Sequence, residues 1–188
     1  MKRESLHYRI YEEKNGKDLI RKSCDYEEKG EKVVIEGKYI QIIADHQKFD
    51  ALFNTSSSGL TEKDGNFTKY IDGNKCGKKK KLFKQFSDEF NFPSYFSYNW
   101  DSFDECFNDL EWLGTKKQII LFIKNFDELL KHDDENRKIF ISLMLSAVKE
   151  WRTGRNYNKS FIEPPIPFTV IIQSNESQTC SENFIEVI

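Results

Sequence analysis

Seven carboxylates and no basic side chain lie between Lys84 and Lys116. The chain has a net charge of −2, so this window of 31 residues, at −7, leaves +5 for the remainder. Ten aromatic residues are interspersed with the acids. The seven acids are Asp88, Glu89, Asp101, Asp104, Glu105, Asp109 and Glu111. Mixed charges would serve solubility equally well, so the segregation favours a surface that binds something positive.

The residues from Asn99 to Leu110 have the pattern of an amphipathic helix with the acids on one side. The apolar residues fall at i, i+3, i+4 and i+7, which is one stripe of a helix: Phe103, Cys106, Phe107 and Leu110. At about 100° per residue, the opposite side gathers Asp101, Asp104, Glu105, Asn108 and Asp109. Asn99 is a suitable N-cap, so the helix is expected to begin directly after it.

Three kinds of chemistry fit carboxylates on one helix face. They can bind a basic partner protein, hold Mg²⁺ for phosphoryl chemistry, or face solvent while complementing the helix dipole. Asp101 and Glu105 form a like-charge i,i+4 pair, and Asp109 and Glu111 lie beyond the first turn, which weakens the solvent explanation. A convex helix face encloses a metal ion poorly, which weakens the enzyme alternative. Its negative charge repels phosphate, so direct nucleic-acid binding is disfavoured. An adaptor for some other basic protein remains an alternative, and a Mg²⁺-dependent enzyme is a weaker one.

The rest of the chain offers little catalytic chemistry. His7, His46 and His132 are far apart, and no phosphate-binding glycine motif or zinc motif is present. The four cysteines are widely separated, which is typical of free thiols in a reducing cytosol. We therefore predict no enzyme activity, no catalytic residues, no metal and no cofactor.

Apolar runs alternate with helical patterns in the second half of the chain. Strands are expected at Phe67–Ile71, Gln118–Ile123 and Phe168–Gln173, and helices at Lys78–Phe90 and Asn136–Trp151. Strands separated by helices favour right-handed crossovers and a parallel sheet. The predicted class is α/β, a three-stranded parallel sheet flanked by helices.

The first sixty residues have a different pattern. Leu6–Tyr11 and Asp18–Arg21 flank the turn signal Asn15–Gly16, and Val33–Ile43 has strand character, so a small antiparallel β extension is expected. Thr55–Gly59 and Thr61–Gly65 have the composition of a linker.

This pattern divides the chain into a β-rich extension (1–60), a main domain (66–175) and a polar tail (176–188), in which 184–188 could add a late strand. The N-terminus leads into no apolar signal segment, and no stretch of 18 apolar residues is present. We therefore expect a cytoplasmic protein without membrane contact.

The segment from Phe92 to Leu110, FPSYFSYNWDSFDECFNDL, resembles the signature of the barstar family, P-x-Y-[YF]-G-x-N-x-D-A-[LF]-x-D-C-L. The expected first strand with its Asp-Gly turn (Phe67–Gly73) and the later strands and helix follow the family's order, so the resemblance covers about residues 66 to 175. It implies a barstar-like fold and an intracellular inhibitor of a small basic ribonuclease, or an immunity protein against a ribonuclease toxin. Members of the family insert the acidic helix and its preceding loop into the enzyme's phosphate-binding cleft. We expect this chain to be a monomer when free.

Carried over position by position, the resemblance implies partner contacts at Tyr95, Asn99, Trp100, Asp101 and Glu105. Asp101 matches the first contact aspartate of the family, and Glu105 takes the place of the second, dominant aspartate. Tyr95 matches the loop tyrosine.

Two further positions depart from the family pattern. Asp104, which we include in the predicted contact set, stands where an aromatic residue is common, and Ser97 replaces a glycine of the loop. Another acidic contact is expected at the start of the next long helix, from Asp133, Asp134 or Glu135.

Overall fold

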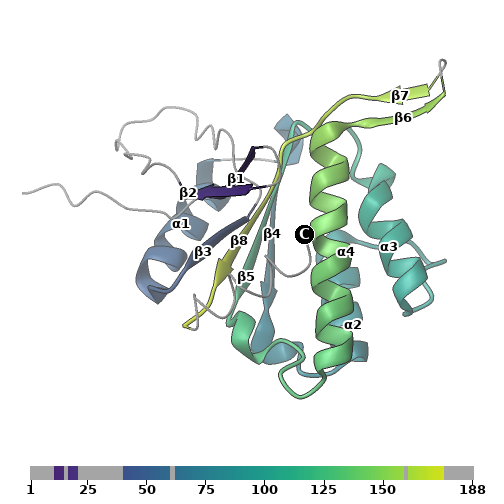
Figure 1. Ribbon diagram of the computed structural model, residues 1–188. Helices are drawn as coiled ribbons and strands as arrows, with labels where there is room; N and C mark the ends of the chain where they lie inside the picture. The colour runs from purple at the N-terminus through teal and green to yellow at the C-terminus, as the bar shows by residue number, and fades with distance from the viewer. Residues whose placement is uncertain (1–10, 15–16, 21–39, 60–61, 159–160, 176–188) are drawn as a thin grey trace, which may run out of the picture.

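A four-stranded sheet with helices on both faces forms the core of the computed structural model, which describes residues 11–14, 17–20, 40–59, 62–158 and 161–175 (Figure 1). In spatial order the strands are β3 (Ile40–Ile43), β8 (Phe168–Gln173), β5 (Gln118–Lys124) and β4 (Asn66–Asp72). Every neighbouring pair is parallel. The α/β class and the three expected parallel strands are confirmed, and β3 adds a fourth.

Strand position explains the sequence patterns. The central strand β5 has five consecutive buried residues, Ile119–Ile123, because helices cover both faces of the sheet. The edge strand β4 alternates, with Phe67, Lys69 and Ile71 buried. The Lys69 amine reaches out of the sheet to Glu62, with Nζ and Oε1 2.8 Å apart. The Glu89 carboxylate accepts the Tyr70 backbone N–H at 2.9 Å. This donor at the open edge of β4 is therefore not available for pairing with a further strand.

The direction of the chain determines which face each helix covers. Helix α1 (His46–Gly59) leads from β3 to the far edge at β4, and the chain then returns through β5 to β8. Because parallel crossovers are right-handed, the two directions of travel place their helices on opposite faces. Helices α2 (Lys79–Phe90), α3 (Trp100–Asp109) and α4 (Asp134–Thr153) accordingly lie on the face opposite α1 (Figure 1). An aromatic core fills the space beneath them: Phe83, Phe86, Phe90, Phe103, Phe107, Phe140 and Phe168.

Two expectations for residues 33–59 were wrong. The β3 strand pairs in parallel with β8 in the main sheet and does not belong to an antiparallel extension. The expected linker at Thr55–Gly59 is the last part of α1. Phe49, Leu52, Phe53 and Ser56 form its sheet-facing stripe at helical spacing, and this apolar burial outweighs the low helix propensity of the serines.

The predicted hairpin around Asn15–Gly16 is present as β1 (Tyr11–Lys14) and β2 (Lys17–Ile20), which pair antiparallel. Residues 33–39, within the expected strand region, and the tail 176–188 lie outside the described residues. The division of the chain at residue 60 stays a prediction. Within the predicted linker at Thr61–Gly65, the structure has a short 3₁₀ helix, η1 (Glu62–Asp64).

The remaining elements are short. Three further 3₁₀ helices follow strands or helices: η2 (Gly73–Lys75), η3 (Glu111–Leu113) and η4 (Phe126–Glu128). A hairpin that we did not expect, β6 (Arg155–Asn158) with β7 (Phe161–Glu163), leads from α4 to β8.

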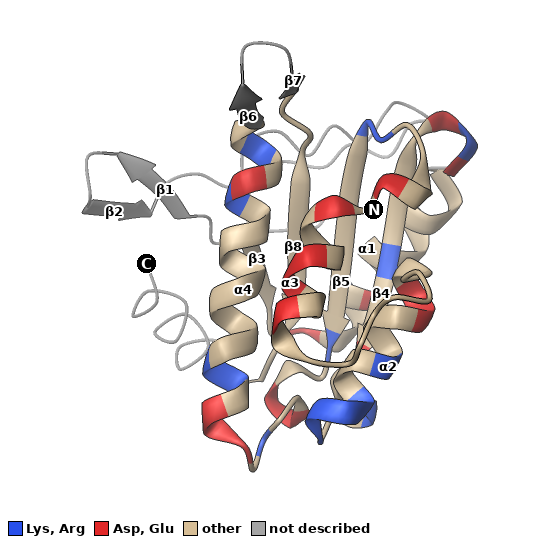
Figure 2. Cartoon of the chain, turned by 90° about the vertical axis from the view of Figure 1, so that its right-hand side faces the viewer, with Lys and Arg blue, Asp and Glu red and all other residues tan. Residues whose placement is uncertain are grey.

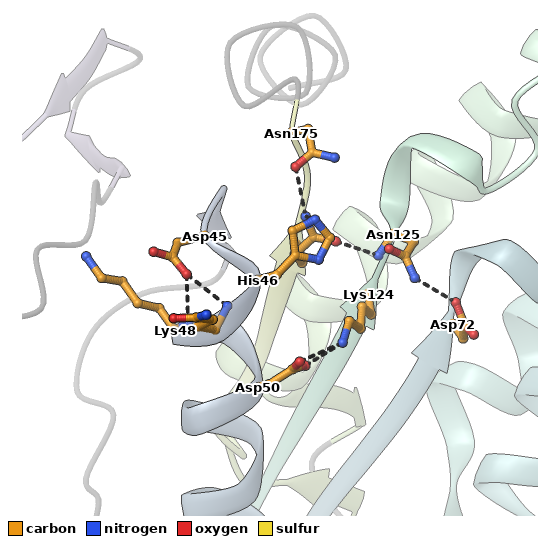
Figure 3. A network of polar contacts seen from close by, with 10 residues as sticks. Asp45, His46, Lys48, Asp50, Asp72, Lys124, Asn125 and Asn175 are labelled. Atoms are coloured by element: carbon orange, nitrogen blue, oxygen red, sulfur yellow. Dashed lines mark hydrogen bonds and ion pairs between the residues drawn. The ribbon is translucent and has the colours of Figure 1, made fainter.

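Polar side chains join the carboxyl ends of the strands (Figure 3). Asn125 donates from its side chain to Asp72 at 3.0 Å and from its backbone N–H to the Gln173 Oε1 atom at 2.9 Å. That second bond fixes the Gln173 amide, so its Nε2 faces the His46 Nε2 atom at 3.2 Å. Lys124 binds Asp50 of α1 at 2.7 Å. These contacts fasten the start of α1 to the sheet.

Candidate functional site

The acidic helix α3 begins with a closed set of hydrogen bonds. The Asn99 Oδ1 atom accepts the Ser102 backbone N–H at 2.8 Å, and the Ser102 hydroxyl accepts the Asn99 N–H at 3.5 Å, which together form a capping box. Ser97 donates its backbone N–H to the same hydroxyl at 3.2 Å. Its own hydroxyl accepts from Asn99 Nδ2, also at 3.2 Å. The serine that replaces the family glycine therefore helps to fix the loop.

The predicted stripe of α3 is confirmed. Phe103, Cys106, Phe107 and Leu110 are fully buried against the aromatic core. Burial raises the pKa of the Cys106 thiol to about 11, and neighbouring Glu105 adds to the shift, so this cysteine is a neutral packing residue at physiological pH.

We call Asp101, Asp104, Glu105 and Asp109 the acidic face of α3; it lies on the side of the helix turned away from the sheet (Figure 2). Asp101 and Glu105 are exposed, whereas Asp104 and Asp109 are half-buried. Asp104 accepts a hydrogen bond from the Asn108 amide at 2.9 Å. Within the described ranges, no Lys, Arg or His forms an ion pair with Asp101 or Glu105. Two carboxylates are thus held on a rigid helix without a counter-charge from the part of the chain that the structure describes.

Trp100 is directed toward the protein rather than toward solvent. Its half-buried ring packs edge-on against Phe83, with centroids 4.7 Å apart, and also contacts Phe103. Its indole N–H donates to the Asn136 Oδ1 atom at 2.8 Å, and the Asn136 amide in turn donates to Asp133 at 2.9 Å. Trp100 therefore ties the start of α3 to the start of α4.

The acidic candidates at the start of α4 differ in their availability. Asp133 is the N-cap of the helix and accepts both the backbone and side-chain N–H groups of Asn136, which commits it to the fold. Asp134 and Glu135 are exposed in the first turn and remain accessible.

Two tyrosines are the large hydrophobic residues that the described surface exposes most, at 55 % for Tyr95 and 48 % for Tyr98. The Tyr95 hydroxyl lies near the Cys106 thiol, and its pKa is raised by partial burial and by the nearby Cys106, Asp109 and Glu105. Both tyrosines precede α3 in the loop that Ser97 and Asn99 fix. The loop and the acidic face therefore form one surface that combines aromatic rings with carboxylates.

Sequence reasoning missed the residues that position this surface. Ser102 completes the capping box, and its place three residues after Asn99 is a signal that could have identified it. Asn136 lies 36 residues from its partner Trp100, and no local pattern links them.

Replacing Asn136 with alanine is expected to lower the free energy of unfolding by about 1–3 kcal/mol, because the half-buried Trp100 indole N–H loses its acceptor. Urea denaturation followed by tryptophan fluorescence measures the change. The control is a double-mutant cycle with Trp100→Phe, in which the two losses should be less than additive. Fully additive losses would mean that the hydrogen bond contributes nothing.

The described residues contain no group of three or more His, Cys, Asp or Glu side chains placed to hold a metal ion. Among those same residues, no helix is long and apolar enough to cross a membrane.

Comparison with known proteins identifies one family. The family model for Barstar (barnase inhibitor) matches residues 66–164, more than half of the 188 residues, and includes β4, β5, α2, α3 and α4. No curated protein matches the chain. The matched segment contains the loop and the acidic face, and the parallel sheet and flanking helices agree with the fold that the resemblance implies. The chain belongs to the barstar family.

Proposed function

We propose that the chain inhibits a small basic ribonuclease by inserting α3 and the loop before it into the enzyme's phosphate-binding cleft. The observation that carries the proposal is the pair of exposed carboxylates, Asp101 and Glu105, on a capped helix with no counter-cation among the described residues. A ribonuclease cleft presents cations to a polyanion. Carboxylates at fixed positions can therefore occupy its phosphate sites.

Each predicted contact residue has a distinct role in this proposal. Asp101 and Glu105 replace phosphates, and Asp104 adds to the attractive potential. Tyr95 covers apolar surface at the rim. Asn99 and Trp100 position the helix, since their polar groups are already bonded within the protein.

The negative window also favours rapid association. Charge complementarity raises the rate of encounter with a cationic partner, which matters when a free nuclease is toxic to the cell that holds it. The proposal therefore includes an immunity role in the cytoplasm, with a chain that is monomeric when free and has no catalytic activity of its own.

The test is an inhibition assay with RNA as substrate. The purified chain is titrated into barnase and into the basic ribonucleases of the secreted fraction of the organism that makes it. We expect stoichiometric loss of cleavage and a one-to-one complex by light scattering. The proposal fails if a tenfold excess of the chain over enzyme leaves cleavage by every one of these ribonucleases unchanged.

A further inference from the structure

Tyr98 has a backbone conformation that its residue type disfavours. Its φ of 57° lies in the left-handed region, where a Cβ atom is strained and where glycine or asparagine is the usual residue. Of the other non-glycine residues with positive φ, Asn91 and Leu110 end helices, Asn125 begins one, and Leu130 lies in the turn between η4 and α4. Tyr98 has no such role, because the N-cap of α3 is Asn99.

The neighbours of Tyr98 maintain this strain. Ser97 on one side and Asn99 on the other are both bonded to Ser102 in the first turn of α3. The chain at position 98 must therefore adopt the turn, whatever side chain it carries. Glycine or asparagine would satisfy the turn with less strain, so the turn alone does not account for an aromatic residue.

Burial does not account for it either. The Tyr98 ring remains 48 % exposed, whereas neighbouring Phe96 is only 5 % exposed. The Tyr98 ring rests on Phe96 with centroids 4.8 Å apart and an interplanar angle of 41°. The ring is therefore in contact with the core through Phe96, while about half of the residue is accessible to a partner. Such a ring is preorganised for stacking, since little side-chain entropy remains to be lost.

The charges around Tyr98 indicate what would stack on it. The ring directly precedes the acidic face, where Asp101 and Glu105 attract cations. Lys84 lies close enough to interact electrostatically with Tyr98, but its amine is held by Asp88 at 2.7 Å. The cation–π contacts found among the described residues involve the rings of Phe67, Phe126 and Trp151. The exposed Tyr98 ring is thus three residues from Asp101 in the chain, at a surface whose carboxylates favour an external cation.

We propose that Tyr98 determines partner specificity by stacking its exposed ring on a planar cation, an arginine or a protonated histidine, at the rim of the partner's basic cleft. This inference rests on the proposed function and extends it. A planar cation gains from both the face of the ring and the adjacent carboxylates, and the stack is strongest where the complex excludes water.

Three substitutions at Tyr98 separate the possible contributions. Tyr98→Leu keeps the side chain apolar and the backbone strained but removes the π-system, and should weaken inhibition by about tenfold or more. Tyr98→Phe removes only the hydroxyl and should change inhibition by less than about threefold. Tyr98→Asn suits the left-handed backbone, so this variant should melt at the same temperature as the wild type or at a higher one. Its inhibition should be no stronger than that of Tyr98→Leu. Asn91→Gly, at another left-handed position, is the matched control and should leave inhibition unchanged.

The probe is barnase, or whichever secreted ribonuclease of the panel the wild-type chain inhibits more tightly. Full inhibition by Tyr98→Leu overturns the proposal, because apolar area alone would then suffice. If Asp101→Ala weakens inhibition and none of the Tyr98 variants does, the specificity role fails while the inhibitor function stands. If the wild-type chain inhibits none of these enzymes, both fail together.

Discussion

Phe49→Ala is expected to lower the free energy of unfolding by about 3–5 kcal/mol. The Phe49 ring is fully buried between α1 and the sheet and packs edge-on against Phe122, with centroids 5.5 Å apart. The substitution would leave a cavity that Ile120 and Ile171 cannot fill without moving the sheet. Urea denaturation, followed by circular dichroism and by tryptophan fluorescence, measures the loss.

The tryptophans make this experiment informative. Trp100, Trp112 and Trp151 all pack in the core on the opposite face of the sheet. If α1 and the rest of the sheet unfold together, the fluorescence midpoint should shift as far as the circular dichroism midpoint. Ser57→Ala, at an exposed position of α1, is the control and should change stability by less than about 0.5 kcal/mol. If Phe49→Ala leaves the midpoint of the fluorescence transition unchanged, α1 and the rest of the sheet do not unfold as one cooperative unit.

The central strands and the acidic helix were predictable because each has a complete local signal. The run Ile119–Ile123 can only be accommodated with both faces covered, and the stripe of α3 repeats at helical spacing over two turns. These features depend on the residues of one segment alone. The sequence therefore indicated both the parallel sheet and the side of α3 that faces solvent.

The second face of the sheet was not predictable in the same way. The β3 strand is only four residues long, and its parallel pairing with β8 joins segments more than a hundred residues apart. The sheet-facing stripe of α1 ends at the buried Ser56, inside a run whose composition is typical of a linker. Tertiary contacts through Phe49 and Phe53 outweigh that local preference.

At the candidate site, the sequence indicated where each residue lies better than what each side chain does. Asp101 and Glu105 are exposed on α3, as the helical pattern predicted. The side chains of Asn99 and Trp100, predicted as contacts, are occupied by Ser102 and Asn136. Because those bonds depend on the exact turn geometry and on a distant helix, periodicity could not reveal them. Partner binding by these residues stays a prediction.

Asp101→Ala and Glu105→Ala are each expected to weaken ribonuclease inhibition by about 2–5 kcal/mol, because buried cations of the enzyme would lose their partner. The free energy of unfolding of the free chain should change by less than about 0.5 kcal/mol, since both carboxylates are exposed and their removal relieves an i,i+4 repulsion. Stopped-flow binding and urea denaturation measure the two quantities separately. Added salt should slow association of the wild-type chain more than it speeds dissociation.

Glu111→Ala separates local contact from long-range attraction. Glu111 is an exposed acid of the same negative window but belongs to η3, beyond the end of α3. Its removal changes the net charge by the same amount, so it should slow association slightly and leave dissociation unchanged. Glu105→Asp retains the charge and shortens the side chain; if the partner's cleft is matched to glutamate, it should speed dissociation and leave association unaltered. Should both alanine variants inhibit as well as the wild type, the binding surface lies outside the acidic face, and the exposed acids Asp134 and Glu135 at the start of α4 become the next positions to substitute.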